Sequence, residues 1–166
     1  MDIGKMKSVF SHSKGFTLVE VMVVIVLLTL SFMIFLQALN TAKEVRAKSE
    51  IRTIQSVILA SHQNLIRSKQ FDENINWPWS LNLGQDPGEI SINDFNDIDD
   101  FNGYQVDALD NYPSFGCNIE VNYVNPETGF HEPIFDQVTN FKRITVSVNH
   151  SQLPSLVDTI IIGKGL

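Results

Sequence analysis

An apolar stretch near the start of the chain most restricts what this sequence can fold into. Phe16 to Leu36 is 21 residues long, and its only polar members are Glu20, Thr29 and Ser31. A helix needs about 20 predominantly apolar residues to cross the hydrocarbon core of a bilayer. We therefore predict that this stretch forms a membrane-spanning helix.

The residues on either side of the stretch decide between a removable signal and an anchor. A secretory signal has an apolar region of only about 7–15 residues followed by a small-residue cleavage site. The stretch here is longer, and the following residues, QALNTAKEVR, contain no clean site of that kind. The sequence thus predicts a retained anchor. Basic residues flank both ends, so charge alone leaves the orientation open, and we favour an N-terminus inside the cell because the short basic leader precedes the first helix.

The charge of the chain changes sign along its length. Residues 1–15 hold three Lys and one Asp, and residues 16–70 hold six basic residues and three Glu. Residues 71–166 hold three basic and fifteen acidic residues. This pattern indicates a basic, helix-prone stalk and an acidic head. An acidic head argues against a nucleic-acid partner, because phosphate binding needs clustered Lys and Arg.

Glu20 is the unusual residue of the apolar stretch. A charged side chain costs roughly 2.5–3.5 kcal/mol at the centre of a membrane helix and less near its end, so a functional role is the default hypothesis. The stretch contains no Lys, Arg or His. The partner of the Glu20 carboxylate must therefore come from another chain or from a newly made N-terminus.

The segment Lys14-Gly15-Phe16-Thr17-Leu18-Val19-Glu20 resembles the class III signal of type IV pilins and type II secretion pseudopilins. The resemblance implies that a prepilin peptidase cleaves between Gly15 and Phe16 and that Phe16 is then N-methylated. It also implies that Glu20 meets the Phe16 amine of a neighbouring pilin during assembly. Further implied partners are the inner-membrane assembly platform and, before assembly, inner-membrane lipid.

The helix is predicted to continue beyond the apolar stretch, from Phe16 to about Ser68. No Gly or Pro occurs between Phe16 and Trp77. Apolar residues recur at helical spacing and predict one packed face. The members of this face are Ile51, Ile54, Ile58 and Leu65, joined by Val45, Val57 and Ile66.

Three segments of the head have the period-2 alternation of strands: residues 117–124, 141–150 and 156–162. We predict an α+β fold in which the long N-terminal helix packs on a small antiparallel sheet with short turns, an architecture that the resemblance to pilins also implies. Cys117, the single cysteine, is expected to be a buried strand residue. The predicted organisation is a leader (1–15), a transmembrane half-helix (16–36), an amphipathic half-helix (37–70) and an acidic head (71–166).

The loop region between helix and sheet offers the only candidate metal ligands. Asp97, Asp99 and Asp100 are weak candidates, because counting back from Gly103 places Ile98 at the first ligand position of a calcium loop. We predict solvated carboxylates here, with no metal and no cofactor. Trp77 and Trp79, which flank Pro78, are expected to pack the start of the loop onto the sheet edge.

No catalytic motif is present, and the four histidines are scattered, so we predict that the chain is not an enzyme. The segments DIDDFNGY and FKRITVSV resemble parts of MSHA-type minor pilins. No Pro lies near Gln37, no Gly lies near Thr29, and Cys117 has no second cysteine. These are departures from the pattern of many pilins, and under the resemblance they fit a minor pilin or a pseudopilin better than a major pilin.

The resemblance therefore implies a minor structural subunit of a type IV pilus. Such a subunit has its head in the periplasm before it joins the pilus. The alternatives are a type II secretion pseudopilin and a membrane-tethered periplasmic binding module.

Overall fold

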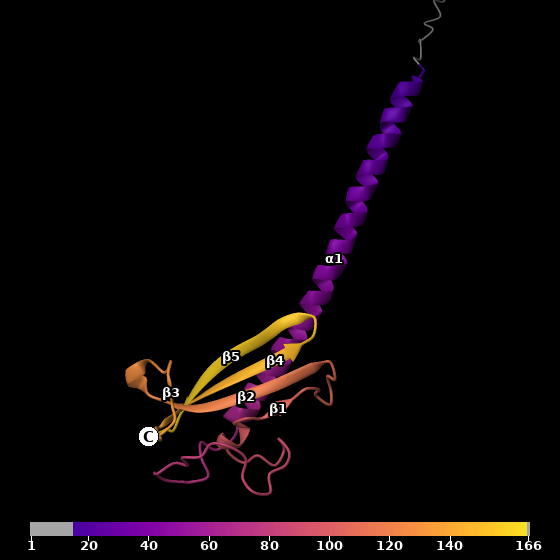
Figure 1. Ribbon diagram of the computed structural model, residues 1–166. Coiled ribbons are helices and arrows are strands. Elements are labelled where there is room, and N and C mark those ends of the chain that lie inside the picture. Colours follow the sequence, from indigo (N-terminus) through magenta and orange to yellow (C-terminus); the bar gives the residue numbers. More distant parts are fainter. Residues whose placement is uncertain (1–14, 166) are drawn as a thin grey trace, which may run out of the picture. The chain divides into compact units, whose positions relative to one another are not determined.

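The computed structural model describes residues 15–165, which form one long helix and a five-stranded antiparallel sheet (Figure 1). The chain divides into two compact units, with the boundary between Val45 and Arg46. Helix α1 (Leu18–Arg67) contributes to both units. The predicted leader lies outside the described residues except for Gly15. The observed helix confirms the predicted one to within two residues at each end.

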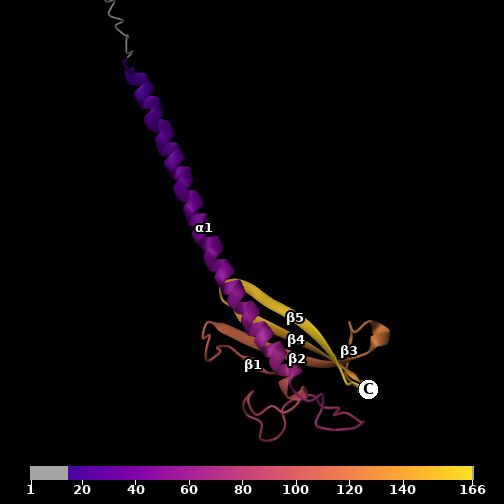
Figure 2. The ribbon, with the colours of Figure 1, turned by 180° about the vertical axis from the view of Figure 1, so that it is seen from behind.

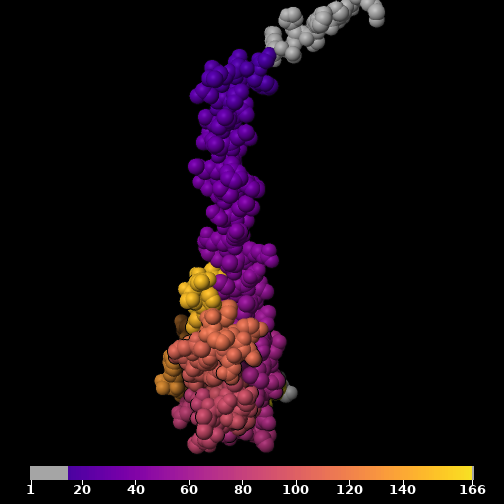
Figure 3. All heavy atoms as spheres, turned by 90° about the vertical axis from the view of Figure 1, so that its right-hand side faces the viewer, coloured from indigo at the N-terminus to yellow at the C-terminus, as the bar shows by residue number. Residues whose placement is uncertain are grey.

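The first unit contains the apolar part of α1. By length and composition this part can cross a membrane, and none of it is buried within the chain (Figure 3). The hydroxyl of Thr29 donates to the backbone carbonyl of Val26 at 2.8 Å. A hydroxyl satisfied inside its own helix needs no water, so the segment suits a hydrocarbon environment.

The second unit begins with the amphipathic part of α1. Ile58 and Ile66 are buried as predicted, whereas Val45 and Val57 are 60% and 54% exposed, so their predicted place on the packed face is wrong. Val57 directly precedes Ile58, and successive helical residues point about 100° apart at 3.6 residues per turn. The partly buried residues of the face are Ile51, Ile54 and Leu65.

Two buried glutamines connect this part of α1 to the sheet. Gln55 is fully buried, and its Nε2 donates to the backbone carbonyl of Val148 at 3.0 Å. Nε2 of Gln63 donates to Oδ2 of Asp158 at 3.0 Å. Figure 2 shows α1 crossing the face of the sheet at β4 and β5, the strands that carry these partners. The glutamines fix the position of the helix on the sheet because a buried amide without partners is costly.

Three long strands form the body of the sheet and confirm the three predicted ones. Neighbouring strands are antiparallel, and in the register Ile119 lies opposite Val146, which in turn lies opposite Asp158. The spatial order is β1-β2-β4-β5, with β3 paired to β2 (Figure 1). The strands are β1 (Gln105–Val106), β2 (Phe115–Val124), β3 (Pro133–Ile134), β4 (Phe141–His150) and β5 (Leu153–Gly163).

The connections differ from prediction at one point. β4 and β5 are joined by a tight turn at Ser151 and Gln152, but residues 125–140 make the connection from β2 to β4 much longer than the predicted short turn. This connection contains the 3-10 helix η2 (Pro126–Thr128) and β3. β1 and β3 were not predicted, because two residues are too few to show an alternating pattern.

The core lies between the second half of α1 and one face of the sheet. Alternate residues of β2 and β4 point into it, as the period of a strand requires. Cys117 is fully buried as predicted, and its burial raises the pKa of the thiol to about 12, which keeps the thiol neutral. Further inward apolar residues of these strands are Phe115, Ile119, Val121 and Tyr123 on β2 and Ile144, Val146 and Val148 on β4.

The loop region closes one end of the core. Trp79 is buried, its indole Nε1 donates to Oδ1 of Asn140 at 2.9 Å, and its ring meets the Phe71 ring edge-on at 5.3 Å. Trp77 is 58% exposed. Only one of the two predicted tryptophan anchors is therefore buried.

Candidate functional site

The predicted cleavage junction lies immediately before α1. Gly15 and Phe16 have no regular secondary structure, and the Phe16 side chain is 79% exposed. Among the described residues, and apart from the chain neighbours of Gly15, no atom lies within 4 Å of the position that a Cβ on Gly15 would occupy. The peptide bond between these residues is thus accessible to a peptidase. Lys14, which belongs to the same motif, lies outside the described residues.

Thr17 and Glu20 form the start of α1. The backbone N–H of Glu20 donates to Oγ1 of Thr17 at 3.2 Å, so the threonine side chain caps the first turn. Glu20 is the acidic residue of that turn, where a negative charge is stabilised by the positive end of the helix dipole. The spacing Thr-x-x-Glu is the sequence signature of a helix N-terminus. In the sequence analysis, Glu20 was considered as a membrane carboxylate and an assembly contact, and this signature was missed.

The helix cap does not provide a partner for the Glu20 carboxylate. The hydrogen bond to Thr17 uses the backbone of Glu20, and the apolar stretch supplies no cationic side chain. The predicted cleavage before Phe16 would create an ammonium group four residues away in the sequence. An ammonium and a carboxylate that leave water together must pair, because each alone is expensive to desolvate. A new N-terminus of the same or of a neighbouring chain can serve as the partner.

Inside the head, Lys142 is the centre of a buried polar cluster that the sequence analysis missed. Its side chain has no exposure, and its Nζ donates to the Phe71 carbonyl at 2.6 Å, to Oδ2 of Asp72 at 3.2 Å and to Oδ1 of Asp99. The same Nζ lies 4.3 Å from the centre of the Phe71 ring and 5.2 Å from that of Tyr123. A sequence signal existed, because period 2 places Lys142 on the inward face with Ile144.

The two carboxyl groups of this cluster are in different electrostatic states. Burial raises the pKa of Asp99 to about 7, although Lys142 opposes the shift. Burial acts in the same direction on Asp72, but the backbone N–H groups of Asn74 and Ser80 and then Lys142 outweigh it and lower the pKa of Asp72. Asp72 is therefore the ionised carboxylate beside Lys142, while Asp99 is readily protonated.

The three candidate metal ligands are buried, so the prediction of solvated carboxylates is wrong. Asp97, Asp99 and Asp100 are 1%, 3% and 1% exposed. Oδ1 of Asp97 accepts the N–H of Asp99 at 2.7 Å, and Oδ2 of Asp100 accepts the N–H groups of Asn96 and Asp97 at 2.8 and 3.0 Å. Their burial was not visible locally because Lys142, the partner of Asp99, lies 43 residues further along the chain.

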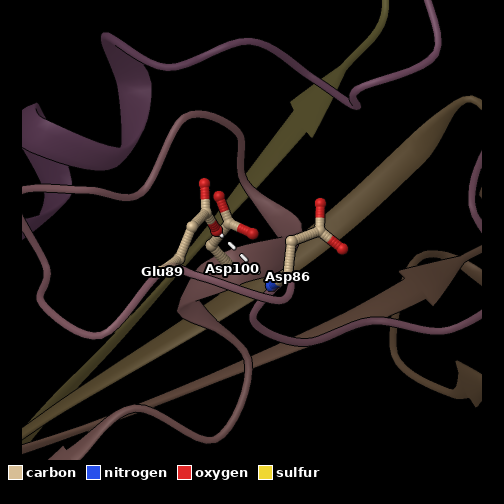
Figure 4. Close-up of side chains that lie close together, drawn as sticks. All are labelled: Asp86, Glu89 and Asp100. Atoms are coloured by element: carbon tan, nitrogen blue, oxygen red, sulfur yellow. Dashed lines mark hydrogen bonds between the residues drawn. The ribbon is translucent and has the colours of Figure 1, made fainter.

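Figure 4 shows a second arrangement, in which Asp100 lies beside Asp86 and Glu89. One carboxyl oxygen of each can lie within 4.8 Å of the others. Glu89 also accepts from the backbone N–H of Asp86 at 3.4 Å and from Nδ2 of Asn96 at 2.8 Å. Burial and the neighbouring Asp100 raise the pKa of Glu89. The hydrogen bonds of Glu89 thus connect residues Asp86 and Asn96 within the loop region.

We expect calcium to leave the stability of the head unchanged, because the oxygens of Asp97 and Asp100 already accept backbone hydrogen bonds and Asp99 faces Lys142. The measurement is thermal unfolding of the purified protein with calcium and with chelator. A metal at 100 times its dissociation constant would add about 2.7 kcal/mol. A calcium-dependent rise in midpoint contradicts the prediction. Its loss in Glu89→Gln but not in Glu132→Gln, a change at an exposed residue of the connection between β2 and β4, would place the ion at the second arrangement.

The three described histidines lie in separate parts of the chain, and the rings of two of them have structural partners. Nδ1 of His62 on α1 is 2.9 Å from the Ile58 carbonyl oxygen. The His150 ring at the end of β4 packs against Phe115, with 4.7 Å between ring centres. His131 lies in the connection between β2 and β4. The structure thus does not bring these three imidazoles together.

The prokaryotic N-terminal methylation motif matches residues 10–36, which include the predicted cleavage junction, Glu20 and the apolar start of α1. No curated protein and no solved structure matches the chain. The motif and the pilin-like α+β fold together support a type IV pilin or pseudopilin precursor. The motif implies processing by a prepilin peptidase and assembly with other pilin subunits, and it defines a structural rather than an enzymatic class. The apolar helix fits membrane anchoring before assembly.

Proposed function

We propose that the chain is a minor structural subunit of an MSHA-like type IV pilus. It is cleaved after Gly15, N-methylated at Phe16 and assembled through its N-terminal helix. The observation that carries the proposal is the methylation motif placed directly before a capped helix, whose membrane-spanning part has only exposed side chains in the single chain. Soluble proteins rarely expose so large an apolar surface, so lipid and then neighbouring subunits must cover it.

The minor role is supported by two features of the described chain. α1 is an unbroken helix through Thr29 and Gln37. Cys117 is fully buried in β2 and is the only cysteine, so the head is not closed by a disulfide. Both features also suit a type II secretion pseudopilin, which is the second candidate. The phenotype of a deletion separates the two, because loss of surface fibres supports the pilus and loss of a secreted enzyme with fibres intact supports the pseudopilus.

In the life cycle that we propose, residues 1–15 are the leader, residues 16–36 anchor the precursor in the inner membrane, residues 37–70 form the amphipathic half-helix and residues 71–166 form the periplasmic head. The prepilin peptidase removes the leader, and the inner-membrane assembly platform then transfers the subunit from lipid to the fibre. Glu20 pairs with the Phe16 amine of a neighbouring subunit during that transfer. A membrane-tethered binding module is the third candidate, and it would keep its leader.

Intact-mass analysis of protein purified from membranes tests the proposal. We expect the mature chain to begin at Phe16 and to carry one added methyl group on its amine. The same gene expressed in cells without the prepilin peptidase provides the control, in which residues 1–15 remain. A chain that retains residues 1–15 in peptidase-competent cells would rule out both the pilin and the pseudopilin.

A further inference from the structure

We propose that Lys142 and Asp99 condense spontaneously to an amide bond, with Asp72 as the catalytic acid–base group. The bond covalently joins β4 to the 3-10 helix η1 (Asp99–Phe101). The geometry points to it because Nζ of Lys142 contacts Oδ1 of Asp99 directly and lies 3.2 Å from Oδ2 of Asp72. The three side chains are 0%, 5% and 0% exposed, respectively.

The pocket around these groups favours condensation over hydrolysis. The Phe71 and Tyr123 rings lie 4.3 and 5.2 Å from Nζ, so two aromatic walls exclude water from the reacting atoms. Well-oriented intramolecular reactions reach effective molarities of about 10⁵–10⁸ M. Such proximity offsets the weak electrophilicity of a carboxylic acid. The absence of bulk water then preserves the product.

Condensation requires a neutral amine and a protonated carboxyl group. The direct contact from Nζ to Oδ1 allows the ammonium proton of Lys142 to pass to Asp99, which yields this pair. Burial supports the transfer, because it raises the pKa of Asp99 to about 7. The other oxygen, Oδ2 of Asp99, is buried without a hydrogen-bond partner, which is costly for a carboxylate but much less so for a neutral carbonyl.

The reaction balances without a co-reactant. The Nζ lone pair of Lys142 attacks Cγ of Asp99, a C–N bond forms, and the carboxyl carbon becomes tetrahedral. Asp72 takes a proton from the attacking nitrogen and gives it to the departing hydroxyl group. The C–O bond then breaks, one water molecule leaves, and Asp72 returns to its carboxylate form. The buried ammonium and the Asp99 carboxylate are replaced by one neutral amide.

Asp72 is positioned for this proton transfer. Its Oδ2 accepts the backbone N–H of Ser80 at 2.8 Å, and its Oδ1 accepts that of Asn74 at 2.9 Å. These bonds lower the pKa of Asp72, so that it begins the reaction as a base. The Tyr123 hydroxyl lies 3.4 Å from Oδ2 and donates to the Ser80 carbonyl at 2.8 Å, which completes the wall of the pocket.

Mass spectrometry of the full-length protein tests the bond directly. Glu120, Glu127 and Glu132 lie between Asp99 and Lys142 in the sequence. Denaturation and cleavage after glutamate therefore separate residues 90–120 from residues 133–166 unless the amide joins them. We expect one joined species whose mass is the sum of the two fragments less one water. Two separate fragments of unmodified mass would overturn the proposal, and this readout does not depend on processing at the N-terminus.

Three variants assign the roles. Lys142→Arg keeps the positive charge but cannot form the amide, so its fragments should separate, whereas the control Lys164→Arg should give the joined species. Asp72→Asn should slow joining after refolding by about 10²–10⁴-fold, the usual contribution of a general acid–base group. Joining at the parental rate would overturn the role of Asp72. If Asp72→Asn or Lys142→Arg does not fold by circular dichroism, the mass of the parent fragments still decides whether the bond exists.

Discussion

Glu20→Ala is expected to remove the protein from sheared fibres while leaving it in the membrane with a folded head. The change deletes the carboxylate that we propose to pair with the Phe16 amine of a neighbouring subunit. Loss of one partner of a buried ion pair typically costs 3–5 kcal/mol, or about two to four orders of magnitude in an association constant. Membrane insertion should be unchanged or improved, because a polar group is removed from lipid.

Glu20→Ala removes the carboxylate without removing the hydrogen bond that caps α1. The bond that caps α1 runs from the backbone N–H of Glu20 to Thr17, so alanine preserves it. The measurement is immunoblotting of membrane and sheared-fibre fractions from cells that carry the variant. Glu50→Ala is the matched control on the same helix, because the Glu50 side chain is 65% exposed and pairs with Arg46 at 3.1 Å. Equal recovery of Glu20→Ala and parent in fibres would show that the carboxylate is not an assembly contact.

Phe101→Ala should strongly destabilise the head, because it truncates a buried side chain of the loop region. Phe101 is fully buried, and its ring packs edge-on against Phe95 with 5.0 Å between centres. Truncation of a buried phenylalanine to alanine costs about 3–5 kcal/mol, because the lost transfer free energy adds to that of the cavity. The measurement is urea unfolding followed by tryptophan fluorescence, with Trp79 as the buried probe.

Ile90→Ala is the control for Phe101→Ala. Ile90 lies in the same loop region but is 90% exposed, so its truncation should change the free energy of unfolding by no more than about 0.5 kcal/mol. A small effect of Phe101→Ala would mean that the loop is not part of the cooperative core.

The elements predicted from sequence were those whose patterns are long enough to read. The unbroken run without Gly or Pro predicted α1, and alternation over ten residues predicted β4. β1 and β3 were not predicted because each is only two residues long. Val57 was misplaced because the helical face was assembled from hydrophobicity, without accounting for the direction in which each side chain points.

The residues of the two candidate sites could be predicted from the sequence to different extents. The proposed processing site is contiguous, so one short motif was enough to predict Gly15, Phe16 and Glu20 as its residues. The Lys142 cluster is assembled from Asp72, Asp99 and Lys142, which the fold brings together from the start of the loop region, η1 and β4. A run of aspartates in a sequence is naturally interpreted as solvated surface unless the cation that pairs with them is known. The sequence did contain one sign of a buried cation, because the alternating pattern of the strand places Lys142 on its inward face.

β5 lies at an edge of the sheet, and this position matters for whether neighbouring heads can aggregate. β5 is an edge strand of the described sheet, and eleven residues of open edge could template pairing with another copy. Pro154 near its start has no N–H to offer, and the Pro154 carbonyl accepts from Gln55 and from Arg52 at 3.4 Å each. At the other edge, β1 is only two residues long. In the fibre that we propose, Pro154 and the shortness of β1 would therefore limit pairing between the sheets of neighbouring heads.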